Sequence, residues 1–196
     1  MEIQEHWERV HTTKGRDVSW WQGEQDLWVD LITDLDPAPD DPIVDIGSGS
    51  SLLLDNLHAR GFRDLTAVDV SDSALQALEA RLGDAVKCVR SNAVDFRPSE
   101  PVRVWHDRAV FHFLTDPTDQ RAYRENLHAG LRQDGFAVVC TFAPDGPDSC
   151  SGLPVQRFAP EEIADALDLH LVRTDRRVHT TPWQSQQPFT IAVLEH

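Results

Sequence analysis

The chain has few cysteines, no excess of basic residues and no long apolar run. Its three cysteines among 196 residues, Cys88, Cys140 and Cys150, are odd in number and widely spaced, which argues against a disulfide framework. No apolar stretch is long enough to cross a bilayer, and residues 1–6 lack the pattern of a signal peptide. We therefore expect a cytoplasmic protein without membrane association.

Acidic residues dominate the charge of the chain. Asp and Glu number 33 against 18 Lys and Arg, and the formal net charge is −15. This charge repels phosphates, so we expect no nucleic-acid partner, although a locally positive pocket is compatible with an anionic small ligand. The acidic, proline-rich residues 34–42 are predicted to form a solvated connector. Because 40% of the residues are hydrophobic, a single globular domain is expected.

Strand and helix patterns alternate along the middle of the chain, as in a parallel sheet covered on both faces. The predicted strands are residues 43–46, 65–69, 85–89, 102–106 and 136–142, and the predicted helices are 2–11, 23–35, 50–60, 71–82, 118–131 and 160–167. Two further strands, 169–178 and 189–194, follow with no helix between them. Strands joined in this way form an antiparallel hairpin, which predicts a mostly parallel sheet whose last strand is reversed.

Residues 43–51, with the sequence IVDIGSGSS, read as a buried strand that turns sharply into a helix. Gly47 and Gly49 allow the bend and let a ligand approach the backbone closely. A dinucleotide-binding turn requires a third glycine where this chain has Leu52, which argues against NAD. An acid about 20 residues further on, here Asp69, suits ribose hydroxyl groups.

These features resemble the class I S-adenosylmethionine (SAM)-dependent methyltransferases from about Trp20 to the C-terminus. Residues 45–49 are similar to the first motif of that family, D/E-x-G-x-G, and Asp69 has the position of its ribose-binding acid. Asn92 and the small residue after it match the position that contacts adenine, where the family usually has Asp. Ser51 replaces the third glycine of the longer form of the first motif.

Two further segments resemble a narrower group of bacterial SAM-dependent methyltransferases. They are residues 104–114, VWHDRAVFHFL, and residues 150–155, CSGLPV. Residues 107–109, Asp-Arg-Ala, also look somewhat like the Asp-Lys-Gly segment of protein-lysine methyltransferases. Neither resemblance indicates which substrate is methylated.

The resemblance implies a fold and a cofactor site. The expected fold is α/β, with a Rossmann-like seven-stranded, mostly parallel sheet, helices on both faces and an antiparallel C-terminal hairpin strand. Residues 1–196 would form one methyltransferase domain, in which residues 1–41 are a helical cap over the active site and residues 42–196 are the SAM-binding core. The expected cofactor-binding residues are Asp45, Gly47, Ser48, Gly49, Ser51, Asp69, Val70, Asn92, Ala93 and His106.

Topology locates the remaining chemistry at the carboxyl ends of the parallel strands, where open sheets bind ligands. His112 is the first candidate for a base or an orienting group, followed by Asp107 and His179. The histidines and Cys150 lack the close ligand-pair spacing of a metal site, so no metal is expected. The candidates for substrate binding are Trp20, Trp21, Arg108 and Cys150. The tryptophan pair is compatible with plain packing or with a flap over a ligand.

The favoured function is methyl transfer from SAM to a small molecule, with S-adenosylhomocysteine (SAH) as the product. Two alternatives stay open: methylation of a protein lysine, and a SAM-binding or interaction protein that has lost catalysis. We expect a monomer or a homodimer.

Overall fold

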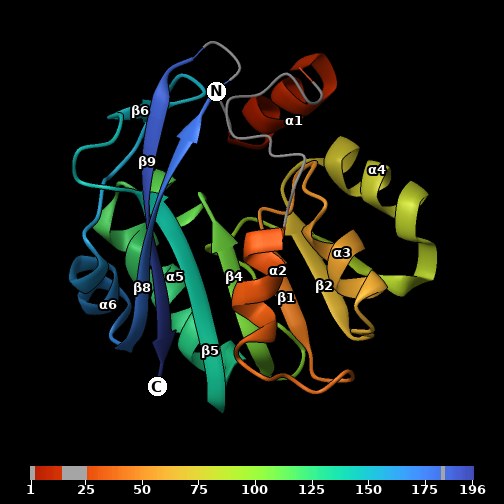
Figure 1. Cartoon of the computed structure of the whole chain (residues 1–196). Coiled ribbons are helices and arrows are strands. Elements are labelled where there is room, and N and C mark those ends of the chain that lie inside the picture. Colours follow the sequence, from red (N-terminus) through yellow and green to blue (C-terminus); the bar gives the residue numbers. More distant parts are fainter. Residues whose placement is uncertain (1–2, 15–25, 182–183) are drawn as a thin grey trace.

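A single seven-stranded sheet forms the centre of the molecule in the computed structural model, which describes residues 3–14, 26–181 and 184–196. The strand order is β3-β2-β1-β4-β5-β9-β8 (Figure 1). The strands are β1 (Ile43–Ile46), β2 (Leu65–Asp69), β3 (Lys87–Arg90), β4 (Val102–Arg108), β5 (Leu131–Phe142), β8 (His170–Thr180) and β9 (Gln186–Glu195).

Strands β1 to β5 pair in parallel, whereas β9 runs antiparallel to both β5 and β8. The predicted mostly parallel sheet with a reversed last strand is therefore confirmed. Strand β2 has the predicted bounds, but β4 extends two residues beyond the predicted end, to Arg108. The extension places Asp107 and Arg108 within the sheet, whereas both were predicted to follow the end of the strand.

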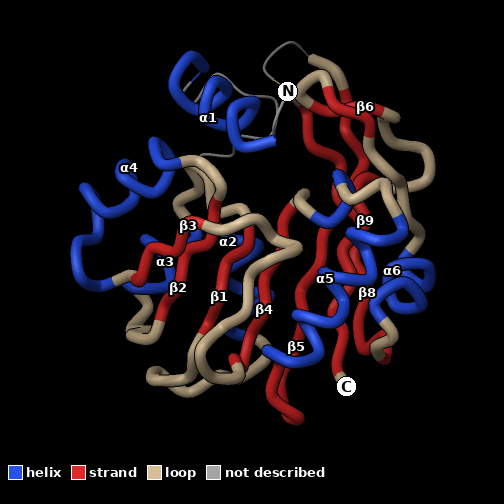
Figure 2. The backbone as a smooth tube through the Cα atoms, turned by 180° about the vertical axis from the view of Figure 1, so that it is seen from behind, coloured by secondary structure: helices blue, strands red, loops and turns tan. Residues whose placement is uncertain are grey.

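Helices cover both faces of the sheet. On one face lie α2 (Asp26–Thr33), α3 (Leu53–Ala59) and α4 (Asp72–Leu82), and on the other lie α5 (Pro117–Gly130) and α6 (Pro160–Leu167), as the two opposite views show (Figures 1 and 2). Each face buries its own set of aliphatic and aromatic side chains. None of the helices in the described part of the chain is both long and apolar enough to span a membrane.

The loop between β5 and α6 contains a small hairpin that its sequence pattern does not predict. Its strands are β6 (Ser149–Cys150) and β7 (Leu153–Pro154), and the φ angles of Ser151 and Gly152 between them are 54° and 80°. Positive φ at both central residues is typical of the tight type I′ turn that suits a hairpin. The hairpin holds Cys150 in a buried position.

Helix α1 (Ile3–Lys14) lies above the upper edge of the sheet, beside α4 (Figure 1). Its Glu8 carboxylate accepts hydrogen bonds from Ser71 Oγ at 2.7 Å, from the Ser73 backbone N–H at 3.2 Å and from the Ser73 hydroxyl. These bonds, those of the Ser73 and Ser71 hydroxyls above all, lower the pKa of Glu8. An anion at the first turn of α4 is also favourable for the helix dipole, so Glu8 anchors α1 to the start of α4.

Candidate functional site

A cavity of about 310 Å³ lies at the carboxyl edge of the sheet. Its lining comes from α1, from the turns that follow β1, β2, β3 and β4, and from the adjoining ends of β5 and β9. This is the edge at which open parallel sheets bind ligands. We refer to this cavity as the main pocket.

The turn after β1 requires glycine for two reasons. Gly47 and Gly49 have φ angles of 66° and 51°, a region that side chains with a Cβ rarely adopt. A Cβ on Gly47 would lie 2.2 Å from Val110 Cγ2, and one on Gly49 would lie 3.1 Å from His11 Cε1. The two glycines therefore let Val110 and His11, which also line the main pocket, approach the backbone of the turn closely.

Asp69 ends β2 beside this glycine turn. One carboxylate oxygen accepts a hydrogen bond from the Gly49 N–H and the other from the Ser71 N–H, each at 2.8 Å. Burial raises the pKa of Asp69, and the N–H donors and the nearby His11 oppose that shift. A carboxylate accepts about four hydrogen bonds, so acceptor capacity is left for a ligand in the pocket.

Eight of the ten predicted cofactor-binding residues line the main pocket. They are Gly47, Ser48, Gly49, Ser51, Asp69, Val70, Asn92 and Ala93. Asn92 lies just after β3, where the Ser91 N–H bonds to the Asp69 carbonyl at 3.0 Å and thus holds the two turns together.

The other two, Asp45 and His106, lie outside the lining. Strand side chains alternate between the faces of a sheet, and both of these residues point to the α2 face rather than to the pocket. They are register partners on β1 and β4, and His106 Nδ1 lies 2.7 Å from Asp45 Oδ1 with both side chains buried. The pair thus links the two central strands behind the glycine turn.

Asp107, a predicted catalytic residue in the extended end of β4, also lies outside the lining. It points to the α5 face, where its carboxylate accepts hydrogen bonds from the Val110 N–H at 2.9 Å, the Phe111 N–H at 3.1 Å and the Tyr123 hydroxyl at 2.7 Å. The Tyr123 oxygen in turn accepts from Trp105 Nε1 at 2.9 Å. Burial raises the pKa of Asp107 to about 6. The geometry gives Asp107 a structural role in holding the turn after β4.

His112 lies in that turn, on the short helix η2 (Phe111–Phe113), and lines the main pocket. It is fully buried, and its Nδ1 accepts a hydrogen bond from the Phe142 N–H at 3.3 Å. Burial lowers the pKa of His112 to about 3, so the ring is neutral at physiological pH. Because Nδ1 is the acceptor, Nε2 carries the proton.

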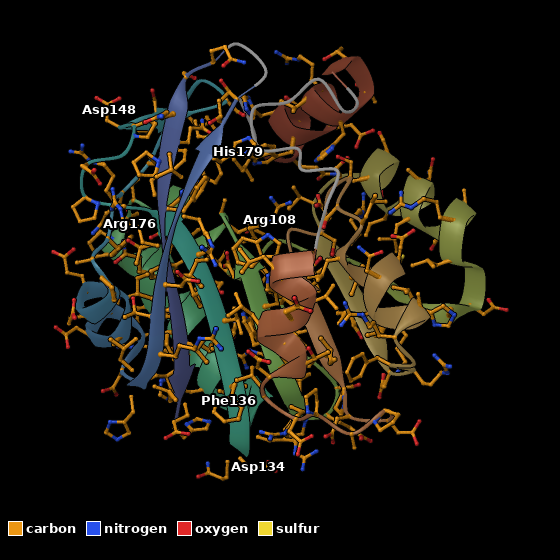
Figure 3. The ribbon with its side chains drawn as sticks, viewed as in Figure 1. Arg108, Asp134, Phe136, Asp148, Arg176 and His179 are labelled. Carbon is orange, nitrogen blue, oxygen red and sulfur yellow. The ribbon has the colours of Figure 1, made fainter. Side chains whose placement is uncertain are left out.

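The remaining predicted site residues separate into three groups. Arg108 and Cys150 line the main pocket, whereas His179 lines a smaller cavity of about 190 Å³ that shares Arg108 with it. In Figure 3, Arg108 lies near the centre of the view and His179 above it. Burial lowers the pKa of Arg108, and the Asp45 carboxylate opposes the shift. Trp20 and Trp21 lie outside the described residues.

Several lining residues escaped the sequence prediction. Ile3, Trp7 and His11 recur every four residues along α1, which is a helical spacing that would have indicated one face, although not what that face covers. Gln187 and Phe189 share one face of β9, and no motif marks them. No group of three or more potential metal-ligating side chains is found within residues 3–14, 26–181 and 184–196.

Comparison with known proteins adds a family match. Residues 43–135 match the sequence model of the family described as a methyltransferase domain. The EEF1A lysine methyltransferase 2 of Danio rerio is 29% identical over an alignment of 107 residues, which covers 50% of this chain and 46% of that protein. The alignment therefore spans about half the length of this curated relative.

Two solved structures share the fold over nearly their whole length. A SAM-dependent methyltransferase from Anabaena variabilis has a TM-score of 0.76 at 15% identity, covering 100% of this chain and 96% of that one. The 1,6-didemethyltoxoflavin-N1-methyltransferase of Burkholderia thailandensis, solved with 1,6-didemethyltoxoflavin and SAH, has a TM-score of 0.74 at 20% identity, covering 98% and 87%. The sequence match and the shared fold together support a methyltransferase domain in this chain.

Proposed function

We propose that this chain transfers a methyl group from SAM to a small molecule. The observation that carries the proposal is that one cavity joins the glycine turn, Asp69 and Asn92 to an aromatic recess around His112. A cofactor at the end beside the glycine turn (the cofactor end) and an acceptor at the end around His112 (the acceptor end) would share one cavity. Helix α1 borders that volume through Ile3, Trp7 and His11.

The residues at the cofactor end suit SAM. The glycine turn lines the pocket beside Asp69, whose carboxylate has acceptor capacity left for ribose hydroxyl groups. Asn92 and Ala93 would border the adenine, with Ser48, Ser51 and Val70 along the rest of the lining. When bound, the cofactor supplies an electrophilic methyl group on a sulfonium, and the protein supplies binding and orientation.

At the acceptor end, the side chains would align the acceptor and exclude water. Alignment of this kind accounts for much of the acceleration of a two-substrate reaction. The pKa of His112 is about 3, which makes the ring a weak base, so we assign His112 to orientation rather than to proton removal. An acceptor atom that attacks without losing a proton first, such as a ring nitrogen or a thiolate, suits this pocket.

Methylation of a protein lysine is the second candidate. It is favoured by the likeness to the Danio rerio enzyme, whose name describes a lysine methyltransferase, over 107 residues. The recess argues for the smaller acceptor, because Phe142, Cys150 and Phe189 line it and are each at least 92% buried. A lysine side chain would have to enter past these residues or past α1.

Incubation of the chain with SAM that carries a tritium-labelled methyl group, in a dialysed lysate and in its small-molecule filtrate, tests the proposal. We expect label in low-molecular-mass products of the filtrate. Label confined to a discrete protein band would support the lysine alternative instead. Absence of transferred label, together with intact SAH binding, would support a SAM-binding protein without catalysis.

A further inference from the structure

Two buried polar atoms in the main pocket have no hydrogen-bond partner among the described residues. They are His112 Nε2 and Gln187 Oε1. His112 is fully buried, and Gln187 is 92% buried. An unsatisfied buried donor or acceptor destabilises a folded protein by roughly 1–3 kcal/mol, so such atoms at a pocket wall indicate a ligand that completes them.

The residues of both atoms belong to the lining of the main pocket. Aromatic rings form a continuous row there: the ring centroids of Trp7 and Phe113 are 5.1 Å apart, those of Phe113 and His112 4.4 Å, those of His112 and Phe142 4.9 Å, and those of Phe142 and Phe189 4.8 Å. Such a row of rings suits a flat, apolar ligand body.

Gln187 continues this row. It precedes Phe189 by two residues on β9, and residues two apart on a strand project from the same face. Both side chains line the main pocket. The lining of the main pocket therefore presents both an unsatisfied imidazole N–H and an unsatisfied amide oxygen.

The two atoms have opposite hydrogen-bonding roles. The Phe142 N–H occupies Nδ1 of His112, which leaves Nε2–H as a donor, whereas the amide oxygen of Gln187 is an acceptor. A ligand that satisfies both needs one acceptor atom and one N–H or O–H. Both protein groups are uncharged, which favours a neutral partner.

We infer that the methyl acceptor is a flat, neutral heterocycle that carries one hydrogen-bond acceptor, such as a ring carbonyl, and one N–H donor, held by His112 Nε2–H and Gln187 Oε1. This inference rests on the proposed function and makes the acceptor class more specific. The ligand carbonyl would accept from His112, and the ligand N–H would donate to Gln187. Simple apolar rings would leave both protein atoms unsatisfied, and carboxylates would present no donor to Gln187.

A matched pair of probes tests the inference without any variant. Carbostyril, the bicyclic lactam of quinoline, has both groups, whereas N-methylcarbostyril has the carbonyl but no N–H. Their affinities for the SAH-saturated protein would be measured by ligand-observed NMR titration. Because one hydrogen bond in a buried site changes affinity about 5- to 10-fold, we expect carbostyril to bind about 5-fold or more tightly than its N-methyl form.

Two variants separate recognition from steric exclusion of the extra methyl group. Gln187→Met removes the acceptor, and the preference for carbostyril over N-methylcarbostyril should then disappear. His112→Phe removes the donor, and both probes should weaken about 5-fold while their ratio persists. Leu171→Met, a partly buried position of β8 outside the main pocket, is the control substitution and should change neither affinity.

The outcomes of this experiment are distinct from those for the proposed function. If SAH binds but carbostyril shows no preference over its N-methyl form, or fails to bind, the acceptor class is wrong and the proposed function stands. If the preference survives in Gln187→Met, the assignment of Gln187 is wrong. If SAH itself fails to bind, the proposed function is overturned.

Discussion

The two ends of the main pocket are built in different ways. At the cofactor end, backbone groups of the glycine turn and the Asp69 carboxylate bond to one another, and its residues come from consecutive turns of the sheet. At the acceptor end, side chains from α1, η2, β5 and β9 meet, and His112 and Gln187 each retain an unsatisfied atom. The backbone thus determines the geometry of the cofactor end. The acceptor end consists of side chains that have hydrogen-bonding capacity left for a ligand.

The largest expected effect concerns the neutral state of His112 at the acceptor end. Its pKa is about 3 in the folded chain against an ordinary 6.5, so the unfolded chain binds the proton more readily. The stability contributed by neutral His112 is full above pH 6.5 and is lost as the pH falls toward 3. Between pH 7 and pH 4 this loss is about 3 kcal/mol, and it should be absent in His112→Phe.

Urea unfolding of both proteins at the two pH values measures this difference. Asp107 has the opposite sign, because its pKa is raised to about 6 and its protonation therefore favours the folded chain as the pH falls. That contribution is common to both proteins and cancels in the comparison. Equal pH dependence of the wild type and His112→Phe would show that His112 is not held neutral.

The second prediction concerns the cofactor end. Gly47→Ala would introduce a Cβ 2.2 Å from Val110 Cγ2 at a φ of 66°. Strain of about 2 kcal/mol in the turn should weaken SAH binding on the order of 30-fold in calorimetry. Gly83→Ala is the matched control, because its φ is 52° and no atom lies within 4 Å of the added Cβ. If the two variants bind SAH equally, the turn does not form the cofactor site.

The third prediction separates support of the pocket from contact with its ligands. Tyr123→Phe leaves Trp105 Nε1 without its acceptor and removes the donor to Asp107, both at buried positions. The free energy of unfolding should fall by about 1.5 kcal/mol. The affinity for SAH should stay within a factor of about two, because none of these three residues lines the main pocket. A large loss of SAH affinity with unchanged stability would reverse the assignment.

The smallest effect is expected at α1, which contributes to both ends. Glu8→Gln weakens the bonds to Ser71 and Ser73 that fasten this helix. We expect SAH to bind about 3-fold less tightly, because Trp7 and His11 would line the pocket less closely. Glu5→Gln, an exposed position on the same helix, should have no effect. An equal response of the two variants would argue against a role of Glu8 in docking α1.

The difference between the two ends also explains what the sequence could predict. The cofactor end could be predicted from the sequence, because a strand, two glycines and an acid at fixed spacing define a turn of known geometry. Asp45 and His106 were assigned to it as well, but strand alternation directs them to the α2 face. Asp107 was predicted to follow β4, but the strand continues two residues further and includes it, and the residue lies outside the pocket lining.

The acceptor end depends on packing between segments far apart in the chain. Gln187 meets the pocket only because β9 inserts between β5 and β8, and no local pattern encodes that contact. The neutral state of His112 likewise follows from burial and from the Phe142 N–H, neither of which is visible in the sequence. The role of a side chain here is set by its surroundings rather than by its residue type.

Calorimetric titration of SAH into the unmodified chain would show whether the glycine turn and Asp69 form a cofactor site separate from the acceptor end. We expect saturable binding of one SAH per chain, weakened in Gly47→Ala and retained in His112→Phe. Absence of binding to the wild-type chain, or equal loss of affinity in both variants, would contradict the division of the pocket into a cofactor end and an acceptor end.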